Sequence, residues 1–259
     1  MKGTYRGEER ELTAKSWREE HHRNFVRHEV EPLGRFISGD RPLTVVDVGA
    51  NKGWFAKGML QLYPINHIHM FDPSPENCAE LSNRESSMIF DQGDFDKLSV
   101  YQFALGDRPG KITLHTNDDG SPLASIYDHV VAGEASPIPL DKSIDVQMET
   151  LDWFLSRKVP LDHVDILKVD TEGAEFSVFK GAENMLRNGM VDFVHFEFGE
   201  HQVSARNFFS DFYEMFKDLG FQMYHLHEGT CWTVDKYSRH YEQFGSVTVF
   251  LAQRIGSTL

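Results

Sequence analysis

The stretch LTVVDVGANKGWFA, residues 43–56, decides the fold of this chain. Residues 44–48 form a short β-branched run that is typical of a strand buried in a parallel sheet. Gly49 and Gly53 interrupt the run, and a helical pattern begins at Trp54. The segment therefore predicts a strand, a tight turn and the start of a helix.

The turn after this strand is suited to a nucleotide-like ligand, because glycines allow close backbone approach and amides at a helix N-terminus bind anions. A dinucleotide-binding G-x-G-x-x-G frame fails, since Asn51 and Trp54 stand where the second and third glycines belong. This argues against a nicotinamide oxidoreductase. What remains is a frame of alternate residues: Asp47, Gly49, Asn51 and Gly53. This frame resembles the first motif of S-adenosylmethionine (SAM) methyltransferases, in which the turn holds the methionine end of the cofactor. Taken alone, it would favour an ordinary strand-to-helix turn.

Length and composition predict one large globular α/β core. Of the 259 residues, 40% are hydrophobic, including 20 Phe, which is ample for one buried interior. Lys plus Arg number 26 and Asp plus Glu 40, so the net charge of −14 disfavours nucleic acid as a substrate. Two distant cysteines predict neither a disulfide framework nor a zinc cluster. Without an apolar signal segment or a membrane-spanning run, we expect a cytoplasmic protein.

Residues 15–37 predict a helix that precedes the core. Its apolar stripe ends at Gly39 and Pro42. We expect residues 1–14 to be loosely held. The helix either covers one face of the sheet, which we favour, or roofs the ligand.

An acidic residue, Asp72, follows the next predicted strand, residues 67–71. It stands about twenty residues beyond the glycine turn, where two carboxylate oxygens match the two adjacent hydroxyls of a ribose. A role as a turn or helix N-cap residue is the less favoured alternative. A third strand over 98–105 would place Ala104 and Leu105 beside an adenine ring.

A second acidic turn follows the predicted strand 165–169. Asp170 and Glu172 lie in this turn, before a helix predicted over 174–186. Ligands of open parallel sheets bind outside the carboxyl ends of the strands, so both acids should face the crevice of Gly49 and Asp72. We expect Glu175, further along, to cap or pair structurally. The long polar stretch 116–142 is a candidate for the substrate side, with a simple connector as the alternative.

Residues 191–198, VDFVHFEF, predict a fifth strand in which Glu197 stands inside an apolar run. A carboxylate there is costly unless it is paired or faces the cleft, so we assign it to function. His195 is expected to be a satisfied core histidine. His201 follows as a candidate general base, or equally as a solvent-facing loop residue. Further on, the pattern predicts a helix over 204–219 and an antiparallel final hairpin with an insertion at 228–245.

Together these segments resemble the FkbM family of SAM-dependent methyltransferases. The segments that carry the resemblance are VVDVGANKGWFA (45–56), MFDPSPEN (70–77), FALGDRPGKITL (103–114), ETLDWFL (149–155) and LKVDTEGAEFSVFKGAENML (167–186). The resemblance departs at Asp72, where the family more often has Glu. It implies an α/β, Rossmann-like class I methyltransferase fold: a mostly parallel seven-stranded sheet with an antiparallel last strand. We place this SAM-binding domain at 42–259, after a helical extension at 1–41.

The resemblance implies O-methylation of a small molecule, sugar, lipid or polyketide-type acceptor. The alternatives are N-methylation of a peptide amide or amine, and a catalytically silent SAM-binding protein. The residues expected to bind the cofactor are Asp47, Gly49, Asn51, Gly53, Asp72, Ala104 and Leu105. The expected catalytic residues are Asp170, Glu172, Glu197 and His201. A metal-free route is favoured over a divalent cation held by Asp170 and Glu197. The oligomeric state is left open, and a homo-oligomer remains an alternative.

Overall fold

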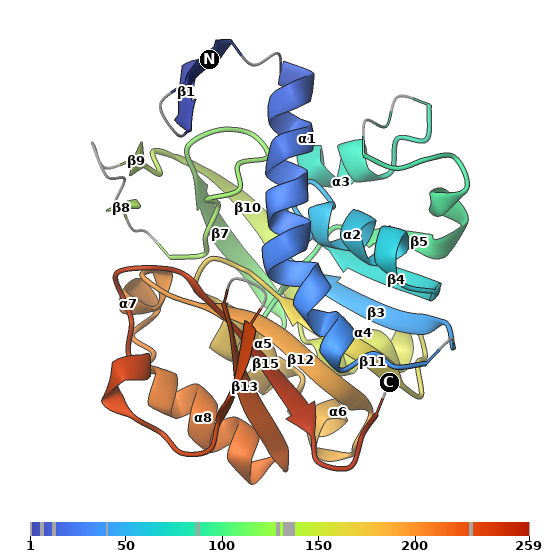
Figure 1. Cartoon of the computed structure of the whole chain (residues 1–259), viewed down its shortest axis with the longest axis vertical. Coiled ribbons are helices and arrows are strands. Elements are labelled where there is room, and N and C mark those ends of the chain that lie inside the picture. The colour runs from blue at the N-terminus through green and yellow to red at the C-terminus, as the bar shows by residue number, and fades with distance from the viewer. Residues whose placement is uncertain are drawn as a thin grey trace.

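A mixed sheet with helices on both faces forms the body of the molecule in the computed structural model (Figure 1). The structure describes the chain except residues 1, 6–7, 12–13, 40, 86, 88, 128–129, 132–137, 228–229 and 259. In spatial order, the eight strands of this sheet are β14 (Thr230–Val234), β13 (Phe221–His227), β15 (Thr248–Arg254), β12 (Val191–Phe198), β11 (Val164–Val169), β3 (Leu43–Val48), β4 (Ile65–Phe71) and β5 (Leu98–Tyr101).

Strand directions confirm the predicted fold class. β12, β11, β3, β4 and β5 pair in parallel, whereas β15 is antiparallel to both of its neighbours, β12 and β13. The sheet has eight strands rather than seven, because residues 230–234 of the predicted insertion pair with β13 as an added edge strand. Residues 228–229 of that insertion lie outside the described residues.

A smaller sheet packs beside the first and consists of β6 (Ala104–Leu105), β10 (Lys142–Glu149) and β7 (Gly110–Thr116). The single strand predicted over 98–105 is therefore wrong. The Phe103 amide donates to the Tyr101 carbonyl at 3.1 Å, which turns the chain out of the main sheet. β6 then pairs in parallel with β10.

The predicted N-terminal helix is present as one helical run of three geometries: α1 (Ala14–Phe25), a π-helical turn η1 (Val26–Val30) and a 3₁₀ segment η2 (Glu31–Arg35). With α2 (Trp54–Leu62) and α3 (Pro75–Leu81) it covers one face of the main sheet. The apolar side chains on that face include Val45, Ile166 and Phe193.

The opposite face is covered by α4 (Leu151–Arg157), α5 (Glu175–Gly181), α6 (Glu183–Arg187) and α8 (Phe209–Asp218). The helix predicted over 174–186 is divided at Ala182. The helix predicted from Ser204 begins at Phe209 instead, because α7 (His201–Ala205) ends at Arg206 in a left-handed conformation (φ 58°).

The remaining elements are short. They are the hairpin β1 (Lys2–Tyr5) and β2 (Glu8–Glu11), the pair β8 (Val130–Val131) and β9 (Ile138–Pro139), and the 3₁₀ segments η3 (Asp94–Lys97) and η4 (Arg239–Tyr241). Parts of two predicted loose segments, residues 1, 6–7 and 12–13 and residues 128–129 and 132–137, lie outside the described residues. Among the helices that the structure describes, none combines the length and the apolar character that a membrane span requires.

Candidate active site

The carboxyl ends of β3, β4 and β11 open into one cavity of about 800 Å³, within the range of small-molecule sites. The predicted site residues that line it are Gly49, Asn51, Asp72, Ala104, Leu105, Asp170, Glu172 and Glu197. Asp47, Gly53 and His201 do not line it. The sheet topology thus brings together residues that are more than 140 positions apart in the sequence.

Gly49 allows the turn after β3 to lie directly against the turn after β11. Its φ is +77°, and a Cβ at this position would lie 1.7 Å from the Asp170 carbonyl oxygen. No side chain fits there, so glycine is required for the approach of the two backbones. Gly53, with φ +79°, is the N-cap of α2, and its missing Cβ leaves room for Phe90 and Leu81.

The Asp72 carboxylate is held by three hydrogen bonds at the end of β4. Oδ2 accepts from the Asn51 amide at 2.8 Å, and Oδ1 accepts from the Ser74 amide at 2.9 Å and from Asn77 Nδ2 at 3.1 Å. Burial raises the pKa of Asp72, while these hydrogen bonds oppose the rise. Oδ2 has one hydrogen bond and keeps the capacity to accept from a hydroxyl.

A buried lysine that the sequence analysis missed stands at the centre of the site. Lys168 Nζ lies 3.3 Å from Asp47 Oδ1 and 3.2 Å from Asp170 Oδ2, and it donates to the Gly49 carbonyl at 3.1 Å. Burial lowers the pKa of Lys168, but the charges of Asp170 and Asp47 outweigh burial and raise it. Asp47, which was assigned to the cofactor, is fully buried as a partner of this ammonium.

The acidic turn after β11 is stabilised by Glu175. Its buried carboxylate accepts from the amides of Thr171 at 2.7 Å and Gly173 at 3.1 Å, which agrees with the expected structural role. Between them, Glu172 has a left-handed backbone (φ 54°) and lines the cavity. Burial, followed by the charge of Asp170, holds the pKa of Glu172 well above its usual range.

Glu197 lines the cavity from β12, and His195 lies two residues earlier on the same face. Burial and the Lys168 charge lower the pKa of His195 to about 3. Its Nε2 is 3.4 Å from Glu29 Oε2, and a hydrogen bond with the Glu29 backbone opposes the lowering of its pKa. The ring is fully buried, as expected of a core histidine. Burial, then the charges of Asp170 and Glu29, raise the pKa of Glu197 well above its usual range.

His201 lies behind the acidic turn. Its Nδ1 is 3.8 Å from Glu172 Oε2, and its Nε2 is 3.8 Å from Glu175 Oε2. The side chain is 2% exposed, so it is not a solvent-facing loop residue. Its position allows it to act on Glu172 rather than on a ligand in the cavity.

The N-terminal helix contributes to the cavity as well as to the cover of the sheet. His21 and Phe25 of α1 line the cavity together with Trp54 of α2. The Trp54 ring centroid lies 4.5 Å from that of His21 and 6.2 Å from that of Phe25. The favoured expectation, a sheet cover alone, is thus incomplete. Figure 1 shows α1 running across the sheet beside α2.

The smaller sheet and the loop that follows its strand β7 form the remaining wall. Phe103, Ala104, Leu105 and Leu114 line the cavity from this side, as do Ser121, Pro122, Ala124 and Ile126. The last four residues belong to the long polar stretch that the sequence analysis named as a candidate for the substrate side. A largely apolar wall here faces the acidic cluster on β11 and β12.

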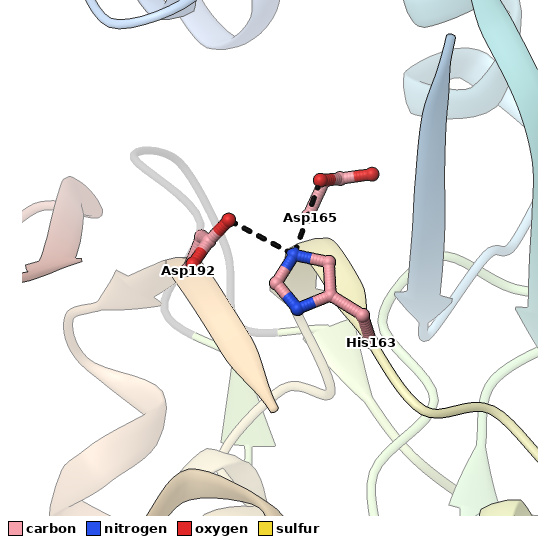
Figure 2. Close-up of side chains that lie close together, drawn as sticks. All are labelled: His163, Asp165 and Asp192. Atoms are coloured by element: carbon pink, nitrogen blue, oxygen red, sulfur yellow. Dashed lines mark hydrogen bonds and ion pairs between the residues drawn. The ribbon is translucent and has the colours of Figure 1, made fainter. Parts of the chain in front are cut away.

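A histidine and two aspartates lie close together at the opposite end of the main sheet (Figure 2). His163 Nε2 is 2.9 Å from Asp192 Oδ2 and 3.3 Å from Asp165 Oδ1. Arg41 already contacts both carboxylates, at 2.5 Å from Asp165 and 3.8 Å from Asp192. Because the Arg41 guanidinium already offsets part of their negative charge, we interpret the group as an ion-pair network that fixes the chain before β3.

The sequence analysis missed Lys168, which lines the cavity, and Glu29, which contacts His195. The signal for Lys168 was present, since it interrupts the apolar strand ILKV as Glu197 interrupts VHFEF. Glu29 gave no such signal, because a charged residue is ordinary on an amphipathic helix. Its inward position depends on the π-helical turn that carries it.

Comparison with known proteins gives a family match over most of this site. A sequence profile described as "Methyltransferase FkbM domain" matches residues 47–223. The chain is 27% identical over 168 residues to the 2-O-methyltransferase NoeI of Sinorhizobium fredii (strain NBRC 101917 / NGR234), an alignment that covers 61% of this chain and 64% of that protein. It is 28% identical over 153 residues to Methyltransferase 1 of Beauveria bassiana (strain ARSEF 2860), covering 54% of this chain and 58% of the relative. The chain thus spans less than two thirds of each of these relatives.

Among solved structures, the chain resembles the crystal structure of Methyltransferase FkbM from Methylobacillus flagellatus KT. The TM-score is 0.51 at 14% sequence identity, and the superposition covers 92% of this chain and 51% of the other. At this identity the likeness shows the fold alone.

Proposed function

Because this chain belongs to the FkbM family of methyltransferases, we propose that it transfers the methyl group of SAM to a hydroxyl of a small-molecule acceptor. The observation that carries the proposal is the single cavity, lined both by the Asp72 carboxylate and by the acids Glu172 and Glu197. The similarity to a protein named as a 2-O-methyltransferase supports oxygen rather than nitrogen as the methylated atom.

The residues present fit this cofactor. Asp72 Oδ2 can accept from a ribose hydroxyl, and Gly49 and Asn51 line the cavity beside it, where the amino-acid end would lie. Ala104 and Leu105 offer apolar contact for a base. When bound, SAM supplies a methyl group on a positively charged sulfur. Asp170 lines the same cavity with a negative charge that suits this sulfur.

The chain's own residues would act by positioning and by moving a proton. The aromatic side chains Phe25 and Trp54 line the cavity and exclude water from it. The walls of the cavity hold the acceptor oxygen in line with the methyl group. A carboxylate of raised pKa is a stronger base than an ordinary glutamate, and both Glu172 and Glu197 have that property. One of these oxygens takes the proton of the acceptor hydroxyl.

Transfer of labelled methyl groups tests the proposal. The full chain is incubated with methyl-labelled SAM and matched acceptor pairs in which a hydroxyl is replaced by an amine or by hydrogen. Label in the hydroxyl compound of a pair supports the proposal. Label only in the amine compounds contradicts it, and so does failure to bind SAM in calorimetry.

A further inference from the structure

Glu29 belongs to a part of the chain that precedes the family match at residues 47–223. It lies on the π-helical turn η1, which packs closely on α2 at Gly58. A Cβ at Gly58 would lie 2.9 Å from a methyl group of Val30 and 3.0 Å from one of Val26, so a larger residue would force these side chains to shift. The turn directs Glu29 inward, where its side chain is 12% exposed. π-Helical turns of this kind often occur at functional sites.

Glu29 joins the buried charged layer around Lys168. Its Oε2 lies 3.4 Å from His195 Nε2, and the His195 ring is 5.4 Å from the Phe55 ring. Lys168 Nζ lies 5.9 Å from the centre of the same Phe55 ring. The charge of Glu29 acts on Glu197, which lines the cavity. Glu29 is thus behind the wall of the cavity and reaches a ligand only through other residues.

The charges in this layer do not balance when every carboxyl is ionised. Lys168 contacts Asp47 and Asp170, and these two carboxylates already exceed its single positive charge. Ionising Glu29 and Glu197 as well would bury further uncompensated negative charge, which is costly. Burial and the Asp170 charge raise the pKa of Glu29 to about 8, although Lys168 opposes the rise. The layer therefore holds at least one proton at neutral pH.

We propose that Glu29 is a positioning residue of the buried charged layer, and that this layer, which includes Glu197, loses a proton to solvent when the positively charged sulfur of SAM occupies the cavity. This inference rests on the proposed function. In the step, a carboxyl O–H bond breaks, its electron pair stays on the carboxylate oxygen and the proton passes to water. The carboxylate at Glu197 then faces the acceptor and can take the proton of its hydroxyl. The base is thereby available only when the methyl donor is present.

Two titratable groups on the elements packed against η1 are bound to other partners. Lys57 of α2 is bound to Asp91 and Asp94, and Tyr224 of β13 donates to Gln253. The described titratable groups that act on Glu29 or Glu197 are Lys168 of β11, Asp170 and Glu172 of the acidic turn and His195 of β12, and Asp47 of β3 contacts Lys168. His195 stays neutral at neutral pH, because its pKa is lowered to about 3.

Proton counting by calorimetry tests the inference without a known acceptor. The full chain is titrated with SAM and, separately, with S-adenosylhomocysteine, which lacks the methyl group and the positive charge on sulfur. Buffers of different ionisation enthalpy report the protons released by each ligand. We expect SAM to release about one proton more than S-adenosylhomocysteine near neutral pH. As the pH increases towards about 8, the ratio of the affinity for SAM to that for S-adenosylhomocysteine should rise by up to about tenfold for each pH unit.

Two variants separate the proposed role from a structural one. Glu29→Gln, which mimics the protonated carboxyl, should reduce the difference in released protons between the two ligands to less than about half. Glu31→Gln removes an exposed acid of the same helical segment and should leave the difference unchanged. A purely structural role would alter both affinities together and would not alter this difference.

An unchanged proton difference in Glu29→Gln overturns the inference, as does equal proton release by the two ligands in the wild-type chain. If neither ligand binds the wild-type chain, the proposed function itself has failed. Should Glu29→Gln not fold, infrared difference spectra of the wild-type chain decide. SAM should bleach a protonated-carboxyl C=O band that S-adenosylhomocysteine leaves in place, and an intact band in both cases overturns the inference.

Discussion

At the scale of single residues, the site depends on charges that are buried in contact with one another. Lys168 neutralises part of the acidic cluster, and its ammonium also holds the Gly49 carbonyl in place. Removing either partner of such a buried pair leaves an uncompensated charge. The glycine turn and the acidic turn are consequently one unit, although about 120 residues separate them.

The substitution Gly49→Ala tests that unit. Its Cβ would meet the Asp170 carbonyl at 1.7 Å, so the two turns must separate. We expect a loss of about 2 kcal/mol or more in the free energy of unfolding, together with loss of SAM binding. Denaturant unfolding and calorimetry measure the two effects. Gly245→Ala is the control, because nothing lies within 4 Å of its Cβ position. Equal stability of the two variants would contradict the account.

Asp72→Ala addresses the ribose contact. The change removes the acceptor of three hydrogen bonds and, on the proposed function, one contact with the cofactor. We expect SAM affinity to fall at least about tenfold in calorimetry, since a hydrogen bond to a charged group contributes about 1.5–3 kcal/mol. Asp107→Ala, at an exposed strand end, is the control and should bind normally. Unchanged affinity in Asp72→Ala would remove Asp72 from the cofactor site.

At the scale of elements, the N-terminal helical run acts through its contact with α2. Val26 and Val30 lie against Gly58, and this contact sets how far His21 and Phe25 project over the cavity. Apolar burial of Val30 and Leu33 fixes the segment on the sheet. The run is therefore part of the site and not a separate appendage.

Gly58→Leu should displace this run. The new side chain has no room between Val26 and Val30, and overpacking of this kind costs about 1–3 kcal/mol. Hydrogen exchange should become faster in residues 14–35 and stay unchanged in α8, on the opposite face of the sheet. Gly93→Leu, whose Cβ position is open, should show neither change. Uniformly faster exchange would point to global destabilisation instead.

Elements with a strong local pattern were predictable, and those defined by pairing were not. β3, α2 and β12 follow from β-branched runs, a helical stripe and apolar alternation. In contrast, residues 230–234 form β14 because they pair with the strand β13. β6 is separated from β5 by a turn at Tyr101. In the site, acids at strand ends were predictable from topology, whereas the position of Glu29 depends on a π-helical turn that has no sequence signature.

At the scale of the whole molecule, the buried carboxyls should make stability depend on pH. The folded-state pKa of Glu29 is about 8, compared with an unperturbed value of 4.5, and those of Glu172 and Glu197 are also raised. Between about pH 4.5 and about pH 8, the folded chain therefore binds more protons than the unfolded chain. The contribution of the protonated Glu29 carboxyl to the free energy of unfolding is complete below about pH 4.5 and is lost as the pH rises through about 8.

We therefore expect the free energy of unfolding to fall between about pH 7 and pH 8, with a contribution of up to about 1.4 kcal/mol per pH unit from Glu29. The buried His195 does not oppose this trend, because its pKa is lowered to about 3 and an unfolded histidine is already largely neutral at pH 7. Denaturant unfolding at both pH values measures the slope. Glu29→Gln should flatten it, and a slope equal to that of the wild type would contradict the assignment.

The segment that covers the cavity is secured unequally at its two ends. Near β3, the guanidinium of Arg41 forms ion pairs with Asp165 and Asp192, at the strand ends farthest from the cavity. At the other end of the segment, His21 and Phe25 of α1 line the cavity. The cover is therefore anchored by ion pairs at its base and by the buried Val30 and Leu33 along its length, while its far end forms part of the cavity wall.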